Sequence, residues 1–204
     1  MAFDTFYLKS IKTCIPAEID QSPKLDYMPP LFRRRLSQLT RMTVDSVHDL
    51  LAENPDFDKN NTKIVSASYR GELTQEFKVN TQFATEGIIM PAAFTLSVFN
   101  CAVAQTTIAF GLKGGYSAVY PKQNDFYSAL SAAVAPLLAG DSQEILFLFG
   151  DERIIEQYNS LPHYKKAISQ EKPFAFAAIL SSQKCGKEFQ LSQCKNMSAW
   201  DFMA

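Results

Sequence analysis

Residues 91–126 read PAAFTLSVFNCAVAQTTIAFGLKGGYSAVYPKQNDF, and this stretch gives the strongest indication of the fold. Its first part, 92–110, places small and apolar residues on nearly every side of a predicted helix. A helix that is apolar all round is buried inside a protein or covered by a partner. The glycines within 111–115 predict a turn after it, and residues 116–121 predict a strand.

Strands and helices alternate on both sides of this stretch. Before it, the pattern predicts a strand at 5–12, an amphipathic helix at 31–53, a short strand at 63–69 and a polar helix at 72–86. After it, the pattern predicts a helix at 124–139 ending at Gly140, a buried strand at 144–152, and strands near 174–182 and 187–192. Such alternation is typical of a layered α/β fold.

Composition narrows the possible functions. The chain has 204 residues, a length that fits one domain. It carries 20 Lys and Arg against 21 Asp and Glu, so no long-range attraction draws it to nucleic acid or anionic lipid. No apolar run approaches the roughly 20 residues of a membrane span. The N-terminus, MAFDTFYLKSIKTC, lacks the pattern of a signal peptide, and we expect a cytoplasmic protein.

The cysteines give no sign of a metal site. Cys14, Cys101, Cys185 and Cys194 form no C-x-x-C pair, and buried or incidental thiols are the favoured interpretation. We expect no metal and no cofactor.

For the other residues that could form a functional site, a structural role is the simpler interpretation. The run of arginines at 33–35 is better explained as a solvated or salt-bridged face than as an anion-binding site. The glycines within 111–115 are better explained as a turn than as a phosphate-binding loop. Residues 150–152, Gly-Asp-Glu, favour a turn or helix cap over a site. The two histidines, His48 and His163, have no neighbouring Ser or Cys to activate. These residues alone therefore predict no catalytic constellation.

Residues 91–126 nevertheless resemble the N-terminal half of β-ketoacyl synthases, which are thiolase-like condensing enzymes. In that family a buried helix carries an Asn, as at Asn100, and ends in a Phe-Gly-Leu-Lys/Arg-Gly turn, as at 110–114. The arginine-rich stretch 33–47 and the Gly-Asp-Glu strand end also resemble family features. The resemblance covers about 25–155 and is strongest over 100–126. It implies one domain, 1–204, with half of a thiolase-like fold: layers α/β/α and a mixed, mostly parallel sheet.

The sequence departs from the family at the position of the catalytic nucleophile, and this departure indicates its function. The nucleophilic cysteine of the family falls on Gln123, at the predicted start of a helix. A cysteine there gains thiolate character from the helix dipole, whereas glutamine cannot form a thioester. Cysteine replaced by glutamine characterises chain-length factors, the inactive partners of ketosynthases. The catalytic histidines of the family come from a C-terminal half that this chain lacks, and His48 and His163 match neither motif. The resemblance therefore implies a pseudo-active site at Gln123 and no catalysis by this chain alone.

The resemblance also implies a partner. A half-length, Gln-type chain is similar to the ketosynthase-like proteins of bacterial aryl-polyene clusters, which are thought to pair with a full-length β-ketoacyl synthase. Strand 116–121 would meet the equivalent strand of that partner, and acyl carrier protein would bind through the complex. The residues expected at the interface and acyl tunnel are Ser68, Tyr69, Ala92, Ala93, Phe94, Asn100, Tyr116, Val119 and Tyr120. The alternative is a free-standing thioester-binding protein or malonyl-thioester decarboxylase that uses Gln123, Asp125 or the Gly-Asp-Glu end.

Overall fold

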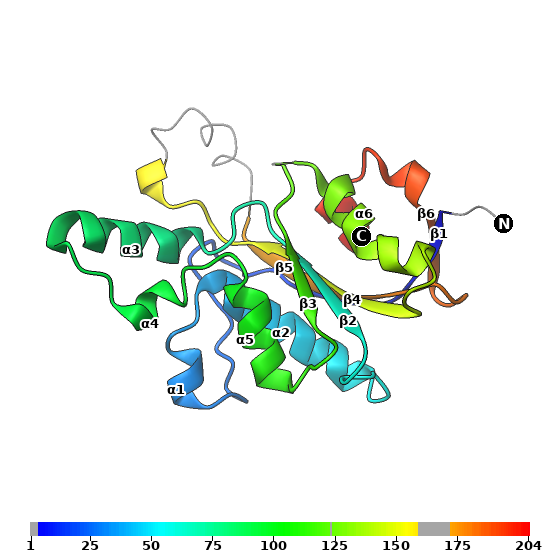
Figure 1. Cartoon of the computed structure of the whole chain (residues 1–204), viewed down its shortest axis with the longest axis horizontal. Coiled ribbons are helices and arrows are strands. Elements are labelled where there is room, and N and C mark those ends of the chain that lie inside the picture. The colour runs from blue at the N-terminus through cyan, green and yellow to red at the C-terminus, as the bar shows by residue number, and fades with distance from the viewer. Residues whose placement is uncertain (1–3, 123, 159–171) are drawn as a thin grey trace.

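The computed structural model describes residues 4–122, 124–158 and 172–204. Its strands are β1 (Thr5–Cys14), β2 (Lys63–Ala67), β3 (Tyr116–Val119), β4 (Glu144–Asp151), β5 (Phe174–Ser181) and β6 (Lys187–Gln190). Its α-helices are α1 (Pro30–Arg33), α2 (Gln38–Glu53), α3 (Leu73–Glu86), α4 (Pro91–Phe94), α5 (Cys101–Phe110), α6 (Phe126–Leu138) and α7 (Ala199–Met203). All six strands belong to one sheet, in the order β3-β2-β4-β5-β1-β6 (Figure 1).

The sheet is mixed, as expected, but parallel pairing is confined to one half of it. β2 pairs in parallel with β3 and β4, whereas β4–β5, β5–β1 and β1–β6 are antiparallel. Helices lie between β2 and β3 and between β3 and β4, and such crossovers permit parallel neighbours. The described part of the β4–β5 connection contains only a 3₁₀ turn, Glu156–Tyr158. The expectation of a mostly parallel sheet is therefore wrong for its pairings.

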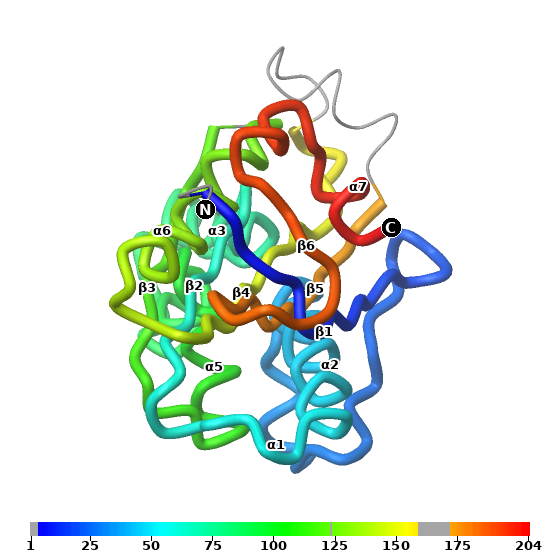
Figure 2. The backbone as a smooth tube through the Cα atoms, turned by 90° about the vertical axis from the view of Figure 1, so that its right-hand side faces the viewer, coloured from blue at the N-terminus to red at the C-terminus, as the bar shows by residue number. Residues whose placement is uncertain are grey.

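Helices cover both faces of the sheet, which confirms the α/β/α layers. α2 and α5 pack on one face, and α6 and α7 on the other (Figures 1 and 2). Side chains alternate along a strand, so β4 sends Phe147 and Phe149 toward α6 and α7, and Leu146 and Leu148 toward α2 and α5. This explains why β4 is apolar at nearly every position.

The helix expected at 31–53 is two helices. α1 ends at Arg33, and α2 starts after Ser37, whose Oγ accepts a hydrogen bond from the Thr40 backbone N–H at 2.9 Å. Serine is a favoured N-cap, so α2 begins after Ser37 as a helix separate from α1. The apolar spacing predicted for the longer helix still holds, because Leu39, Val44, Val47 and Leu50 are all buried.

The prediction of a single buried helix at 92–110 is also wrong. α4 covers only four residues, and α5 starts after Asn100. The hydroxyls of Thr95 and Ser97 donate to the carbonyls three residues earlier, at 3.0 and 2.9 Å, and such bonds compete with a regular helix. Within this chain most of the stretch is half-buried: residues 101–103 and Thr106 are buried, whereas Phe94 and Ile108 are 53% and 70% exposed.

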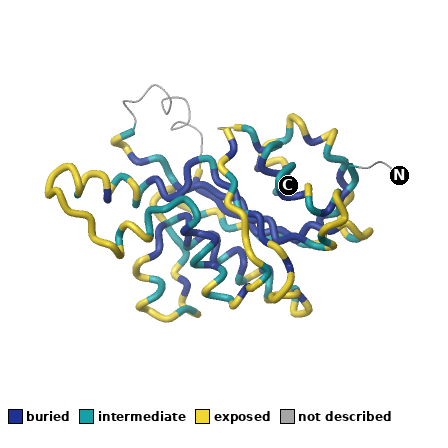
Figure 3. Tube along the Cα trace, in the orientation of Figure 1, coloured by how far each residue is buried: buried dark blue, intermediate teal, exposed yellow. Residues whose placement is uncertain are grey.

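The remaining elements differ from the prediction mainly at their ends. β2 and β3 stop two residues early, α6 starts at Phe126, and α7 was not foreseen because it is only five residues long. The turn expected at the glycines is confirmed: Gly111 and Gly115 have φ of 66° and 80°. Figure 3 shows the buried sheet and the largely exposed α3–α4 segment that extends from it.

Candidate functional site

The turn that follows β2 is hydrogen-bonded to the carboxyl end of β4. Asp151 Oδ1 accepts hydrogen bonds from Ser68 Oγ at 2.7 Å and from the backbone N–H groups of Tyr69 and Arg70 at 3.1 Å each. Arg70 Nη2 lies 3.8 Å from Asp151 Oδ2, and both side chains are almost fully buried. The Gly-Asp-Glu end therefore holds the turn after β2, as the structural interpretation of these residues predicts.

Glu152 continues this role as a helix cap. Its Oε1 accepts a hydrogen bond from the Thr74 backbone N–H at 2.5 Å, in the first turn of α3. The backbone N–H of Leu39, in the first turn of α2, also favours the charged form of Glu152. One carboxylate thus faces two helix N-termini, where negative charge is favoured. Asp151 and Glu152, at the end of β4, are therefore both engaged in hydrogen bonds that hold neighbouring backbone.

A second buried glutamate lies at the start of α3. Glu72 Oε1 accepts a hydrogen bond from Thr40 Oγ1 at 2.6 Å, and the side chain is only 2% exposed. Burial and the charge of Glu152 raise the pKa of Glu72 to about 8. The sequence does not indicate that Glu72 and Glu152 interact, since the two residues are far apart in the chain.

A pocket of about 210 Å³ lies beside the start of α6. Tyr69, Asn124, Asp151, Phe174 and residues 198–200 line it. Asn124 has a φ of 65°, and the next residue, Asp125, caps α6 by accepting from the Ser128 backbone N–H at 3.1 Å. Asn124 and Asp125 follow Gln123 directly in the sequence, whereas Gln123 itself lies outside the described residues. The alternative role of Asp125 in catalysis thus competes with its role as a helix cap.

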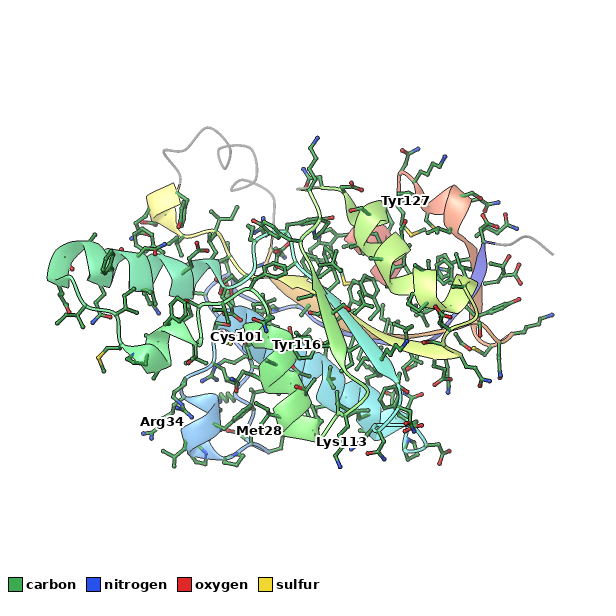
Figure 4. All side chains as sticks on the ribbon, in the orientation of Figure 1. Met28, Arg34, Cys101, Lys113, Tyr116 and Tyr127 are labelled. Atoms are coloured by element: carbon green, nitrogen blue, oxygen red, sulfur yellow. The ribbon has the colours of Figure 1, made fainter. Side chains whose placement is uncertain are left out.

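Several of the predicted interface residues lie on the edge strand β3 or next to it. Asn100 Nδ2 donates a hydrogen bond to Tyr116 Oη at 2.9 Å, which ties the start of α5 to the sheet edge. Figure 4 labels Tyr116 on β3 and Cys101 at the start of α5, the two elements that meet here. Tyr120 is 66% exposed and packs edge-on against Phe99, with ring centroids 4.9 Å apart. Val119 is half-buried.

The segment 76–98, called the arm below, extends away from the sheet. It comprises most of α3, the following turn and α4, and its shape is visible in Figure 1. Ala92 and Phe94 are exposed and Ala93 is half-buried. Sequence analysis missed further exposed apolar side chains on the arm: Phe83, Ile88, Ile89 and Met90, at 37–60%. An apolar periodicity does not reveal whether the same chain covers it, so no sequence signal distinguished these residues from a core.

The predicted site residues thus separate into two groups. Ser68 is buried, with its hydroxyl on Asp151, and Tyr69 lines the pocket. The remaining residues of the set lie on the arm, at the start of α5 and on or just after β3. Four of them are exposed: Ala92, Phe94, Tyr116 and Tyr120.

The candidate groups that the structure describes have structural contacts. Burial raises the pKa of the Cys101 thiol to about 12, so it is no thiolate at neutral pH. Arg33 pairs with Asp26, which confirms a salt-bridged role for that arginine. His48 stacks on Tyr27 with ring centroids 3.7 Å apart, and His163 lies outside the described residues. Among the described residues, no group of three potential ligands is placed to hold a metal ion, and no helix is both long and apolar enough to span a membrane.

Together the mixed sheet, its two helical layers and the helix start beside the pocket define a thiolase-like α/β fold of the ketosynthase type. The family model described as "Beta-ketoacyl synthase, N-terminal domain" matches residues 10–202, and the chain belongs to that family.

Solved structures show where this fold is found. The chain is 25% identical to a chain of a structure from Xenorhabdus doucetiae that contains the ketosynthase ApeO in complex with its chain length factor ApeC. That match has a TM-score of 0.71 and covers 89% of this chain and 80% of the other, so the two are similar in length.

Two further structures share the fold at 14% identity. They are the ishigamide ketosynthase/chain length factor, with a TM-score of 0.67, and a type II polyketide synthase acyl-carrier protein in complex with its ketosynthase, with 0.65. Each match covers 87% of this chain and 62% of the other. A comparison with curated protein sequences finds no match.

Proposed function

We propose that this chain is a non-catalytic, chain-length-factor-like subunit. It pairs with a full-length β-ketoacyl synthase and shapes the acyl tunnel in polyene, polyketide or fatty-acid-type biosynthesis, with acyl carrier protein docking on the complex. It acts in the cytoplasm as a single domain. The observation that carries the proposal is that β3 is an edge of the sheet among the described strands, in a molecule whose arm also carries exposed apolar side chains.

An exposed edge strand is a template for pairing with another chain. Ile64 N–H donates to the Gly115 carbonyl at 3.0 Å, so Gly115 faces β2. Backbone groups alternate along a strand, and those of Tyr116 and Ala118 therefore point away from the sheet. Exposed apolar side chains beside such an edge mark a surface that a partner covers.

The sequence and the comparisons support the same proposal. The resemblance implies that Gln123 takes the place of the family's nucleophile, and burial raises the pKa of the Cys101 thiol to about 12. The similar chain length in the ApeO–ApeC structure fits a subunit of this size. The competing role, a free-standing thioester-binding protein or decarboxylase, loses support because Asp125, Asp151 and Glu152 are engaged in caps and turns.

Co-expression with a full-length ketosynthase from the same biosynthetic cluster tests this proposal. The tagged chain should retain the untagged ketosynthase, and Ala118→Pro should reduce that retention at least about tenfold by removing one outward-facing N–H. Ala118→Ser keeps the N–H and is the matched control, which should bind as the wild type does. If Ala118→Pro and the wild type retain the ketosynthase equally, β3 is not the pairing edge.

A further inference from the structure

At its N-terminal end, the arm is attached to the rest of the chain through the first turns of α3. Only Leu73 and Val79 are buried among the residues of that helix. The backbone N–H of Thr74 is held by Glu152, and Glu72, at the N-cap of α3, is held by Thr40 of α2. The root of the arm thus depends on two glutamates that are each no more than 2% exposed.

These two carboxyl groups have different surroundings. Glu152 faces N–H donors from two helix termini, which favour its anionic form. Glu72 has hydroxyl groups near it, and its Oε2 has no hydrogen-bond partner among the described residues. The other charged or titratable groups around the pair are Arg70 before α3, Asp151 on β4, Cys101 on α5, and Asp20, Lys78 and Arg153 around the outer side of Glu152.

We propose that Glu72 and Glu152 form a proton-dependent latch at the root of the arm. With a proton on Glu72 and a charge on Glu152, the pair holds the first turn of α3 against α2. When the root opens, Glu72 enters water and releases its proton to solvent, so rising pH favours the open arm. This device goes beyond the proposed function, and only its effect on a partner depends on that function.

The direction of the effect follows from burial. The pKa of Glu72 rises from 4.5 to about 8 in the closed form, and that of Glu152 rises to about 6. A buried acid with a raised pKa stabilises the closed form most fully below its ordinary pKa, and this stabilisation declines as pH rises to the raised value. Above the pKa of Glu152, the remaining pH dependence belongs to Glu72.

Hydrogen exchange of the isolated chain measures the opening of the arm directly. After correction for intrinsic exchange rates, amides of residues 73–80 should exchange more than about tenfold faster at pH 8 than at pH 6. Glu72→Gln keeps a neutral acceptor for Thr40 and should remove this difference. Glu76→Gln changes an exposed glutamate on the same helix and should leave it intact. Equal pH dependence in Glu72→Gln and the wild type would overturn the latch.

A carboxyl titration by ¹³C NMR of the wild-type chain gives a second test that needs no variant to fold. One glutamate should titrate near pH 8, and Glu72→Gln identifies it where that variant folds. If every glutamate of the folded chain titrates below about pH 5.5, both buried groups behave as exposed ones and the proposal fails. Because neither test includes a ketosynthase, failure of the partner model leaves both results interpretable.

Discussion

At the scale of single residues, the packing of Phe99 depends on Gly71. This glycine has a φ of 63°, and a Cβ there would lie 2.6 Å from Phe99 Cδ2. Phe99 in turn packs against Tyr120 at the end of the edge strand. The glycine therefore links the turn after β2 to the surface expected to meet a partner.

Gly71→Ala should lower the free energy of unfolding by about 2–4 kcal/mol, because backbone strain and overpacking add. Gly87→Ala is the matched control: its φ is 69°, but nothing lies within 4 Å of the added methyl group. It should cost only about 1–2 kcal/mol of backbone strain. Urea denaturation of both variants measures the difference, and equal losses would mean that Phe99 moves aside freely.

Residue-level prediction from the sequence succeeded where a local pattern was present. Two acids alone are weak evidence for a site, so residues 150–152 predict a turn or helix cap, and the hydrogen bonds of Asp151 and Glu152 confirm this. The Glu72–Glu152 pair could not be predicted, since it depends on how α2, α3 and β4 meet in space. The resemblance identified Gln123 by position, although that residue lies outside the described part of the chain.

At the scale of elements, the stretch 92–110 was the least accurately predicted. Its apolar composition indicated a helix, but hydroxyls at Thr95 and Ser97 interrupt the regular hydrogen bonding. The same composition left two explanations open, burial within the chain or cover by a partner. The exposed Phe94 and Ile108 exclude the first explanation for those positions and agree with the second.

The arm is the element expected to set product length. If Ala93 lines the acyl tunnel, Ala93→Phe should block it, and the reconstituted pathway should release products shorter by one or more elongation cycles. A half-buried position next to a cavity should absorb most of the roughly 1–3 kcal/mol that overpacking costs, so the complex should persist. Ala93→Val should shorten products less. Mass spectrometry of the products decides this, and an unchanged length distribution in an intact complex would exclude Ala93 as a length determinant.

At the scale of the whole molecule, the layered fold was predictable because β4 and β5 are buried on both faces and read as continuous apolar runs. The pairing directions were not, because β1 pairs with strands from the far end of the chain. Such long-range pairing leaves no local sequence pattern. The result is a sheet with β3 exposed at one edge, and an arm with exposed apolar side chains that extends from the same molecule.

If the proposed function is correct, this chain is one half of an obligate pair with a ketosynthase. Light scattering coupled to size exclusion, applied to the co-expressed proteins, gives the mass of the assembly. We expect a complex of one ketosynthase with one copy of this chain, joined by an interface that buries more than about 2,000 Å² in total. A well-behaved monomer of this chain that elutes apart from a ketosynthase homodimer would contradict it.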